Sequence, residues 1–174
     1  MRKKLFWVQF VGFVFVSVVG SLLHFLYDWT KKSVFVALFS ATNESTWEHM
    51  KLFFVPALIF AIIEYFIVGR EYPNFWSAKL IGIVVGLLSI PILYYTFVGA
   101  FGMSPDWVNV LIFYIATALS FVVETIMILR NRPNFSIKLS IVIFVIIGLC
   151  FIIFTFLPPP IPLFVDPTTG LKGI

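Results

Sequence analysis

The stretch LSIVIFVIIGLCFIIFTFL, residues 139–157, contains no charged side chain. About 20 apolar helical residues cross a hydrocarbon core of ~30 Å, so a run of this length predicts a membrane-spanning helix. Over the whole chain of 174 residues, 61% are hydrophobic and only 11% are charged. A water-soluble domain of this size has too small an interior to bury so much apolar surface. The composition therefore indicates an integral membrane protein.

Four more apolar runs of similar length precede this one, and together they predict an all-α membrane protein. We expect five spanning helices, at residues 5–27, 50–69, 76–100, 107–129 and 136–157. The first run follows three basic residues, as in a signal peptide. It is longer than the usual apolar region of such a peptide, and no A-x-A cleavage pattern follows it. We therefore expect it to be retained.

The basic residues are divided unevenly between the two ends of these spans. With a cytoplasmic N-terminus, eight of the twelve Lys and Arg residues lie inside, as the positive-inside rule requires. These eight are Arg2, Lys3, Lys4, Arg70, Lys79, Arg130, Arg132 and Lys138. We therefore predict a multi-pass protein of the cell membrane with an external C-terminus. Because topology accounts for the net charge of +4, that charge does not indicate nucleic-acid binding.

An internal repeat relates the second and third spans to the fourth and fifth. A shift of sixty residues gives these matches: Glu64 with Glu124, Arg70 with Arg130, and Pro73-Asn74-Phe75 with Pro133-Asn134-Phe135. Polar matches in the same order are rarer by chance than apolar ones. We predict two tandem helical hairpins of the same orientation, residues 47–100 and 107–157, related by an axis along the membrane normal. The first helix stands outside the repeat.

Glu64 and Glu124 each lie inside a predicted span, where an unpaired carboxylate would cost on the order of several kcal/mol. We expect them to pair with Lys79 and Lys138, which would give one structural ion pair in each hairpin. The alternative is a pair of facing carboxylates that handle a proton or a cation near the cytoplasmic side.

A second polar group surrounds the stretch ATNESTWEHMK, residues 41–51. Ser45 and Glu48 have the spacing of a capping box, whose side chains bind free N–H groups at a helix start. Residues 33–49 precede the second span and contain an apolar run too short to cross the membrane, which predicts a re-entrant or interfacial segment. The first span would then end at the same level. The predicted ligand-binding residues of an outward-facing pocket are His24, Asp28, Asn43, Glu44, Glu48, His49 and Lys51.

Two histidines and a carboxylate are the ligands of a common class of divalent-metal sites. The candidate metal ligands are His24, His49 and Glu48, and the candidate cofactor is a divalent metal such as zinc. Glu44, Glu48 and His49 are the candidate catalytic residues, with a carboxylate as general base. A metal-free pocket and simple helix capping are the alternatives, since the chain has no H-E-x-x-H pattern and no cysteine cluster.

The proline-rich tail, residues 158–174, follows the last span. It is predicted to leave the span as a polyproline II segment and to turn at Asp166-Pro167. Ile161, Leu163 and Phe164 are large apolar residues that a free tail would expose. We therefore expect the tail to lie across the outer face as a lid over the polar cluster.

The motifs NESTWEHMK, YPNFWSAK and PPPIPLFVDPTTGLKGI resemble those of a family of small bacterial multi-pass membrane proteins of unknown function. The resemblance covers most of the chain and brings no activity, substrate or cofactor. It implies these family features: Asn43, Glu44, Trp47, Glu48, His49, Lys51 and Asp166-Pro167. At Pro160 the family pattern has a histidine, so the resemblance gives this chain no third histidine ligand.

The sequence is compatible with three functions. The first is binding of a small ligand or ion in the outward-facing pocket, with transport as one use of such a site. The second is metal-dependent hydrolysis of a lipid or an isoprenoid within the membrane. The third is a non-catalytic role in membrane assembly. Whether the protein is an enzyme is left open.

Overall fold

The computed structural model describes residues 2–174 and is all-α. Its five long helices are α1 (Arg2–Trp29), α3 (Thr46–Ile67), α4 (Phe75–Phe101), α5 (Asp106–Arg130) and α6 (Ile137–Phe156). The short elements are α2 (Val34–Ala37), η1 (Gly69–Glu71) and η2 (Pro162–Phe164). Within the described residues, the five long helices are each long and apolar enough to cross a membrane. The predicted fold class is confirmed.

Local sequence signals account for several of the helix ends. Ser45 caps α3, because its Oγ accepts a hydrogen bond from the Glu48 backbone N–H at 3.4 Å. Gly102 ends α4 in the left-handed region, with φ 78°, which glycine adopts at little cost. Asn131 ends α5 in the same region, with φ 51°. These residues therefore mark the boundaries between helix and loop: Ser45 at the start of α3, Gly102 at the end of α4 and Asn131 at the end of α5.

Small residues on α4 allow its neighbours to approach closely. Gly82 and Gly86 lie one helical turn apart. A Cβ atom on Gly82 would lie 2.1 Å from Cγ of Glu124 on α5, and one on Gly86 would lie 2.4 Å from Cζ of Phe53 on α3. Because such distances exclude a side chain, glycine is required for α4 to pack between α3 and α5.

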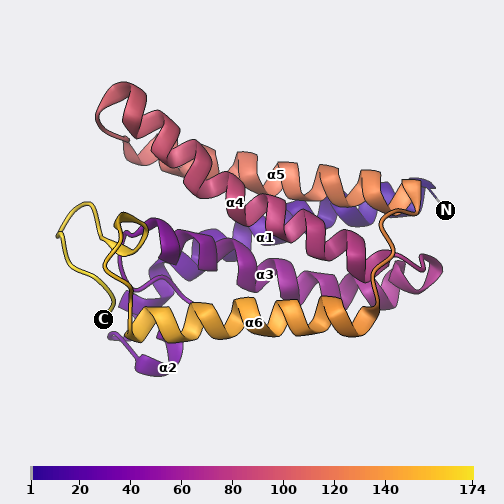
Figure 1. The fold of residues 1–174 in the computed structure, drawn as a ribbon, viewed down its shortest axis with the longest axis horizontal. Helices are drawn as coiled ribbons and strands as arrows, with labels where there is room; N and C mark the ends of the chain where they lie inside the picture. Colours follow the sequence, from indigo (N-terminus) through magenta and orange to yellow (C-terminus); the bar gives the residue numbers. More distant parts are fainter. Residues whose placement is uncertain (1) are drawn as a thin grey trace.

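The helices α5 and α6 lie on opposite sides of the bundle, with α1, α3 and α4 between them (Figure 1). The helix α6 packs against α3 and α4, and α3 and α4 pack against each other. The second predicted hairpin is therefore not packed as the first one is. Superposition of residues 47–100 on residues 107–157 stays a prediction.

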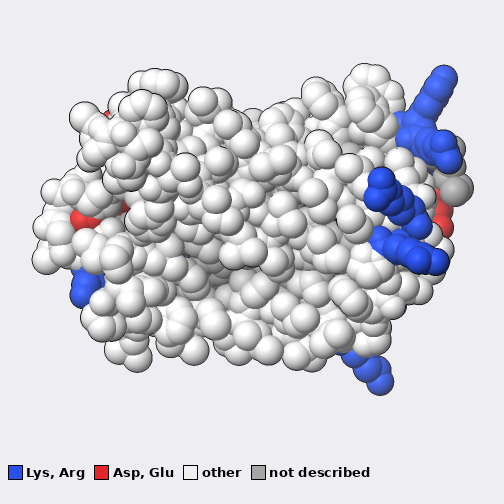
Figure 2. Space-filling model, turned by 45° about the horizontal axis from the view of Figure 1, so that its top comes forward, with Lys and Arg blue, Asp and Glu red and all other residues white. Residues whose placement is uncertain are grey.

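Charged residues are concentrated at the ends of the bundle. Figure 2 shows most Lys and Arg side chains of one face at a single end and a long middle part without charge. We call this end the basic end; its exposed basic residues are Arg2, Lys3, Lys4, Arg70, Arg130, Arg132 and Lys138. Large apolar side chains are exposed along the five long helices between the two ends. This surface suits lipid, and the chain is a multi-pass membrane protein.

Candidate functional site

A cavity of about 820 Å³ lies at the end of the bundle opposite the basic end. The helices α1, α3, α4 and α5 form its wall, and Pro167 and Thr168 of the tail also line it. Its apolar wall includes Leu52, Ile90 and Phe113. Polar side chains from three different segments gather at one place in this wall, and they form the candidate site.

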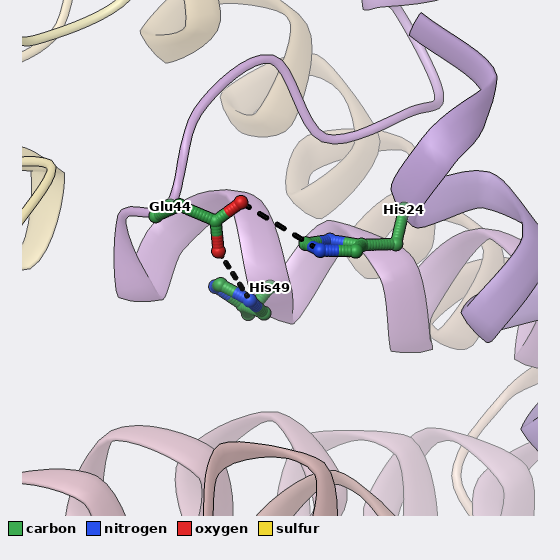
Figure 3. Close-up of side chains that lie close together, drawn as sticks. All are labelled: His24, Glu44 and His49. Carbon is green, nitrogen blue, oxygen red and sulfur yellow. Dashed lines mark ion pairs between the residues drawn. The ribbon is translucent and has the colours of Figure 1, made fainter. Parts of the chain in front are cut away.

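The candidate site consists of His24, Glu44 and His49, whose side chains point toward one another (Figure 3). Nε2 of His24 lies 3.6 Å from Oε1 of Glu44, and Nε2 of His49 lies 3.5 Å from Oε2 of the same carboxylate. One potential ligand atom from each of the three residues lies within 4.8 Å of the other two. All three side chains line the cavity. We call this group the His-Glu-His site.

The loop between α1 and α3 brings Glu44 to the two histidines. The hydroxyl of Ser40 donates a hydrogen bond to the carbonyl oxygen of Leu23, which ties the loop to α1. Oδ1 of Asn43 accepts a hydrogen bond from the Ser45 N–H at 2.9 Å, and its Nδ2 donates to the Gly173 carbonyl at 3.0 Å. Asn43, predicted as a ligand-binding residue, thus holds the loop and the tail together.

The ring of His49 is oriented by its own helix. Nδ1 lies 2.9 Å from the carbonyl oxygen of Ser45, one turn earlier in the chain. The neutral tautomer that satisfies this carbonyl carries its proton on Nδ1, so Nε2 presents a lone pair to the Glu44 carboxylate. Two acceptors that face each other repel unless a proton or a cation lies between them.

The two His–Glu separations of the His-Glu-His site are close to those between neighbouring ligands of a metal ion, and one ligand atom from each residue lies within 4.8 Å of the others. The separations of 3.5 and 3.6 Å exceed those of ordinary N–H···O hydrogen bonds, which are about 2.7–3.2 Å. Around tetrahedral zinc, with bonds of about 2.0–2.2 Å, neighbouring ligand atoms lie roughly 3.3–3.5 Å apart. Metal-bound histidines commonly donate their other ring N–H to a backbone carbonyl, as His49 does to Ser45. The residues present therefore fit a divalent transition metal.

Glu48, predicted as a metal ligand, makes its contacts away from the His-Glu-His site. Its carboxylate lies 2.7 Å from Nζ of Lys51 and accepts hydrogen bonds from the Thr42 N–H and the Thr155 hydroxyl, each at 2.9 Å. Successive helical residues point about 100° apart. Glu48 therefore faces the interior of the bundle, whereas its neighbour His49 faces the cavity. Glu44, from the loop, is the carboxylate that lies beside both imidazoles.

Two other predicted ligand-binding residues also lie away from the His-Glu-His site. Lys51 is fully buried and donates hydrogen bonds to the Ala37 carbonyl at 2.8 Å and to the Thr155 hydroxyl at 2.9 Å. It thereby joins α3 to α2 and α6. Asp28 is exposed at the end of α1 and is not among the residues that line the cavity.

The tail is fastened to the loop through Asp166. Its carboxylate accepts hydrogen bonds from the Thr168 N–H at 2.7 Å, the Thr168 hydroxyl at 2.6 Å and the Glu44 N–H at 3.3 Å. Burial would raise the pKa of the Asp166 carboxyl, but the hydrogen bonds from Thr168, Glu44 and Thr169 hold that pKa below its ordinary value. Phe164 packs against Trp47 of α3, with ring centroids 4.8 Å apart.

We expect Asp166→Asn to increase amide hydrogen exchange in the tail and in residues 42–45 by about tenfold or more. The NH₂ of Asn would replace one carboxylate oxygen and would face either the Glu44 N–H or the N–H groups of Thr168 and Thr169. A buried donor without an acceptor costs about 1–3 kcal/mol. Mass-spectrometric hydrogen exchange of the detergent-solubilised protein measures the effect. Asp28→Asn, at an exposed position, is the matched control. Unchanged exchange in Asp166→Asn would show that the tail is held by its apolar residues.

A second polar cluster lies closer to the basic end. Nζ of Lys79 on α4 lies 2.5 Å from Oε2 of Glu64 on α3 and 2.5 Å from Oε2 of Glu124 on α5. We call these residues the buried cluster, since each is at most 1% exposed. Lys138 was predicted to pair with Glu124, but it is exposed near the start of α6, on the other side of the bundle. A single lysine therefore serves both carboxylates.

Sequence reasoning missed three polar residues that complete these clusters. Gln9 donates a hydrogen bond to Glu64 at 2.9 Å, Ser120 donates to Glu124 at 3.2 Å, and Thr155 bridges Glu48 and Lys51. Gln9 carries the clearest signal, because it is the one amide within the apolar run 5–16. Ser120 and Thr155 carry no such signal, since hydroxyl residues are common in membrane helices, where they bond to their own backbone.

A family model with the description "Family of unknown function (DUF6512)" matches residues 1–174. Neither the curated proteins nor the solved structures include a match to this chain. The function must therefore be inferred from the site itself.

Proposed function

The chain belongs to the family of unknown function DUF6512, and we propose that this multi-pass membrane protein binds a divalent transition-metal ion with His24, Glu44 and His49. The observation that carries the proposal is the orientation of His49. Its Nδ1 is engaged by the Ser45 carbonyl, and its Nε2 lies beside a carboxylate oxygen at 3.5 Å. A metal ion between these two acceptor atoms removes their repulsion, because both atoms bind it as ligands.

The surroundings of the site supply a place for a second ligand. Three protein ligands leave at least one position of a four-coordinate metal open. Because all three residues line the cavity of about 820 Å³, a bound molecule can reach that position. The apolar wall formed by Leu52, Ile90 and Phe113 suits the apolar part of such a molecule. We therefore expect a small amphiphilic ligand whose polar group binds the metal.

Metal analysis of the purified protein tests the proposal. We expect about one equivalent of a divalent transition metal per chain, removed by a chelator and restored by added zinc, iron or manganese, because two imidazoles and a carboxylate bind such ions. Elemental analysis gives the content, and calorimetric titration of the chelator-treated protein gives the affinity. A protein that is purified without metal and gives no binding heat with any of the three ions contradicts the proposal.

Metal-dependent hydrolysis is a second candidate, because catalytic zinc sites have three protein ligands and one open position. Asp106, at the first turn of α5, lines the same cavity and supplies a carboxylate that is not a proposed ligand. A base at this place would take a proton from the attacking water. The candidate requires that zinc-loaded protein cleave a phospholipid or a prenyl diphosphate in vesicles and that Asp106→Asn keep the metal but lose the cleavage. Equal cleavage by loaded and chelator-treated protein would reject it.

A further inference from the structure

The buried cluster contains more acidic than basic groups. Lys79 carries one positive charge, and Glu64 and Glu124 would carry two negative charges if both were ionised. The three side chains are 0–1% exposed. Burial of an uncompensated charge costs on the order of several kcal/mol or more. This cost favours the neutral form of a buried ionisable group. Among the described residues, the cluster therefore lacks one unit of positive charge.

Within residues 2–174, the helices packed around the cluster contribute no further charged group. The helix α1 contributes Gln9, which is neutral, and α5 also contributes the hydroxyl of Ser120. The ring centroids of Phe75 and Phe121 lie 5.7 and 5.0 Å from Nζ of Lys79, so two aromatic rings pack against this ammonium group. At the basic end, Lys4 pairs with Glu71 and Arg70 lies over Phe66, so these cations are engaged at the surface.

We propose that the buried cluster binds one proton, which the carboxyl groups of Glu64 and Glu124 share on either side of Lys79. With this proton the cluster is neutral. The proposal is independent of the metal site. His49 and Glu64 are fifteen residues apart on α3, which at ~1.5 Å per residue separates the two places by ~22 Å.

The side chain of Gln9 provides an acceptor for this proton. Its Oε1 is buried and has no hydrogen-bond partner among residues 2–174, while its Nε2 lies 2.9 Å from Oε1 of Glu64. The oxygen and nitrogen of a side-chain amide are interchangeable by a half-turn of the amide group. After that turn, a proton on Oε1 of Glu64 is donated to Oε1 of Gln9. Lys79 then keeps its hydrogen bond to Oε2 of Glu124 and its ion pair with Oε2 of Glu64, so these contacts use the other oxygen of each carboxyl group.

The hydroxyl of Ser120 is the corresponding hydrogen-bond partner for a proton on Glu124. It lies 3.2 Å from Oε1 of Glu124 and can accept a hydrogen bond as well as donate one. Both carboxyl groups thus have a partner in the protonated and in the ionised form. Either carboxyl group can therefore hold the proton, and the orientations of Gln9 and Ser120 adapt to the one that does.

Infrared spectroscopy of the detergent-solubilised protein at neutral pH tests the proposal, because protonated carboxyl groups absorb apart from carboxylates. We expect a signal of about one carboxylic acid per chain, as the charge count requires. Glu64→Gln and Glu124→Gln should each abolish it, because the remaining glutamate and Lys79 form a neutral pair. Glu71→Gln, at an exposed glutamate of the basic end, is the matched control and should leave the signal unchanged.

Lys79→Met supplies a second readout. Without the lysine both carboxyl groups must be neutral, so the acid signal should double. The absence of an acid signal in the wild type, or its persistence in both glutamine variants, would overturn the proposal. An acid signal that appears only when sodium and potassium are removed would also overturn it, since the site would then bind a metal cation in place of the proton. If Lys79→Met does not fold, the two nearly isosteric glutamine variants still decide the question.

Discussion

Glu44→Gln is expected to lower the affinity for a divalent metal ion by on the order of 100-fold or more, because loss of even an outer-shell partner of a metal ligand costs 10–100-fold. Glutamine is neutral and binds a metal ion more weakly than a carboxylate does. Its NH₂ group would also point at one of the two imidazole nitrogens that now face the carboxylate oxygens. Calorimetric titration of chelator-treated protein with zinc measures the change.

Two histidine variants complete this test. His24→Asn and His49→Asn should each reduce zinc affinity by a similar factor, since each removes one of three ligands. Asp28→Asn, on an exposed face of α1 at the same end of the bundle, is the control and should bind zinc as the wild type does. If Glu44→Gln retained full affinity and a folded Glu48→Gln lost it, the ligand set His24, Glu48 and His49 expected from the sequence would be right and the one proposed from the structure wrong.

The membrane class could be predicted from the sequence because it depends on length and composition alone. A run such as residues 139–157 has no stable place in water, whatever its neighbours are. The site residues His24, Glu44 and His49 could also be proposed, because polar groups near the ends of apolar helices lie at the same level. These inferences need no knowledge of how the helices are arranged around one another.

The choice between Glu44 and Glu48 could not be made from the sequence, since it depends on rotation of α3 about its axis. Glu48 fits a capping box, and Ser45 does cap the helix, but the Glu48 side chain bonds to Thr42, Lys51 and Thr155. Thr155 comes from α6, more than a hundred residues later in the chain. A contact of this kind becomes visible only when the packing is known.

The partner of Glu124 was missed for the same reason. The repeat suggested Lys138, which corresponds to Lys79. In the structure α6 lies on the other side of the bundle from α5, so Lys138 is exposed and Lys79 contacts both carboxylates. A repeat in sequence constrains the residues of each segment but not the neighbours that each segment meets. Because of this difference the buried cluster holds two carboxylates and one lysine. The proposed proton site depends on the resulting excess of one negative charge.

Lys51→Met is expected to reduce the free energy of unfolding by about 3–5 kcal/mol, because removing one partner of a buried ion pair leaves the other charge uncompensated. The remaining carboxylate of Glu48 is 2% exposed, and its hydrogen bonds from Thr42 and Thr155 do not neutralise it. Glu48→Gln should be similarly costly, since Lys51 would then be the unpaired charge. Under the capping interpretation alone the same change would be nearly silent, because glutamine also serves in a capping box.

The double variant Glu48→Gln/Lys51→Met separates charge compensation from packing. It removes both charges and keeps side chains of similar length, so it should recover most of the lost stability, as replacements of whole buried ion pairs often do. Denaturant-induced unfolding in detergent micelles, followed by circular dichroism, gives the four free energies of the cycle. Lys31→Met, at an exposed position beyond α1, is the control and should change stability by no more than about 0.5 kcal/mol. If the double variant were as unstable as the sum of the two single variants, the two side chains would act independently, and the contact of 2.7 Å between them would not explain why both are buried.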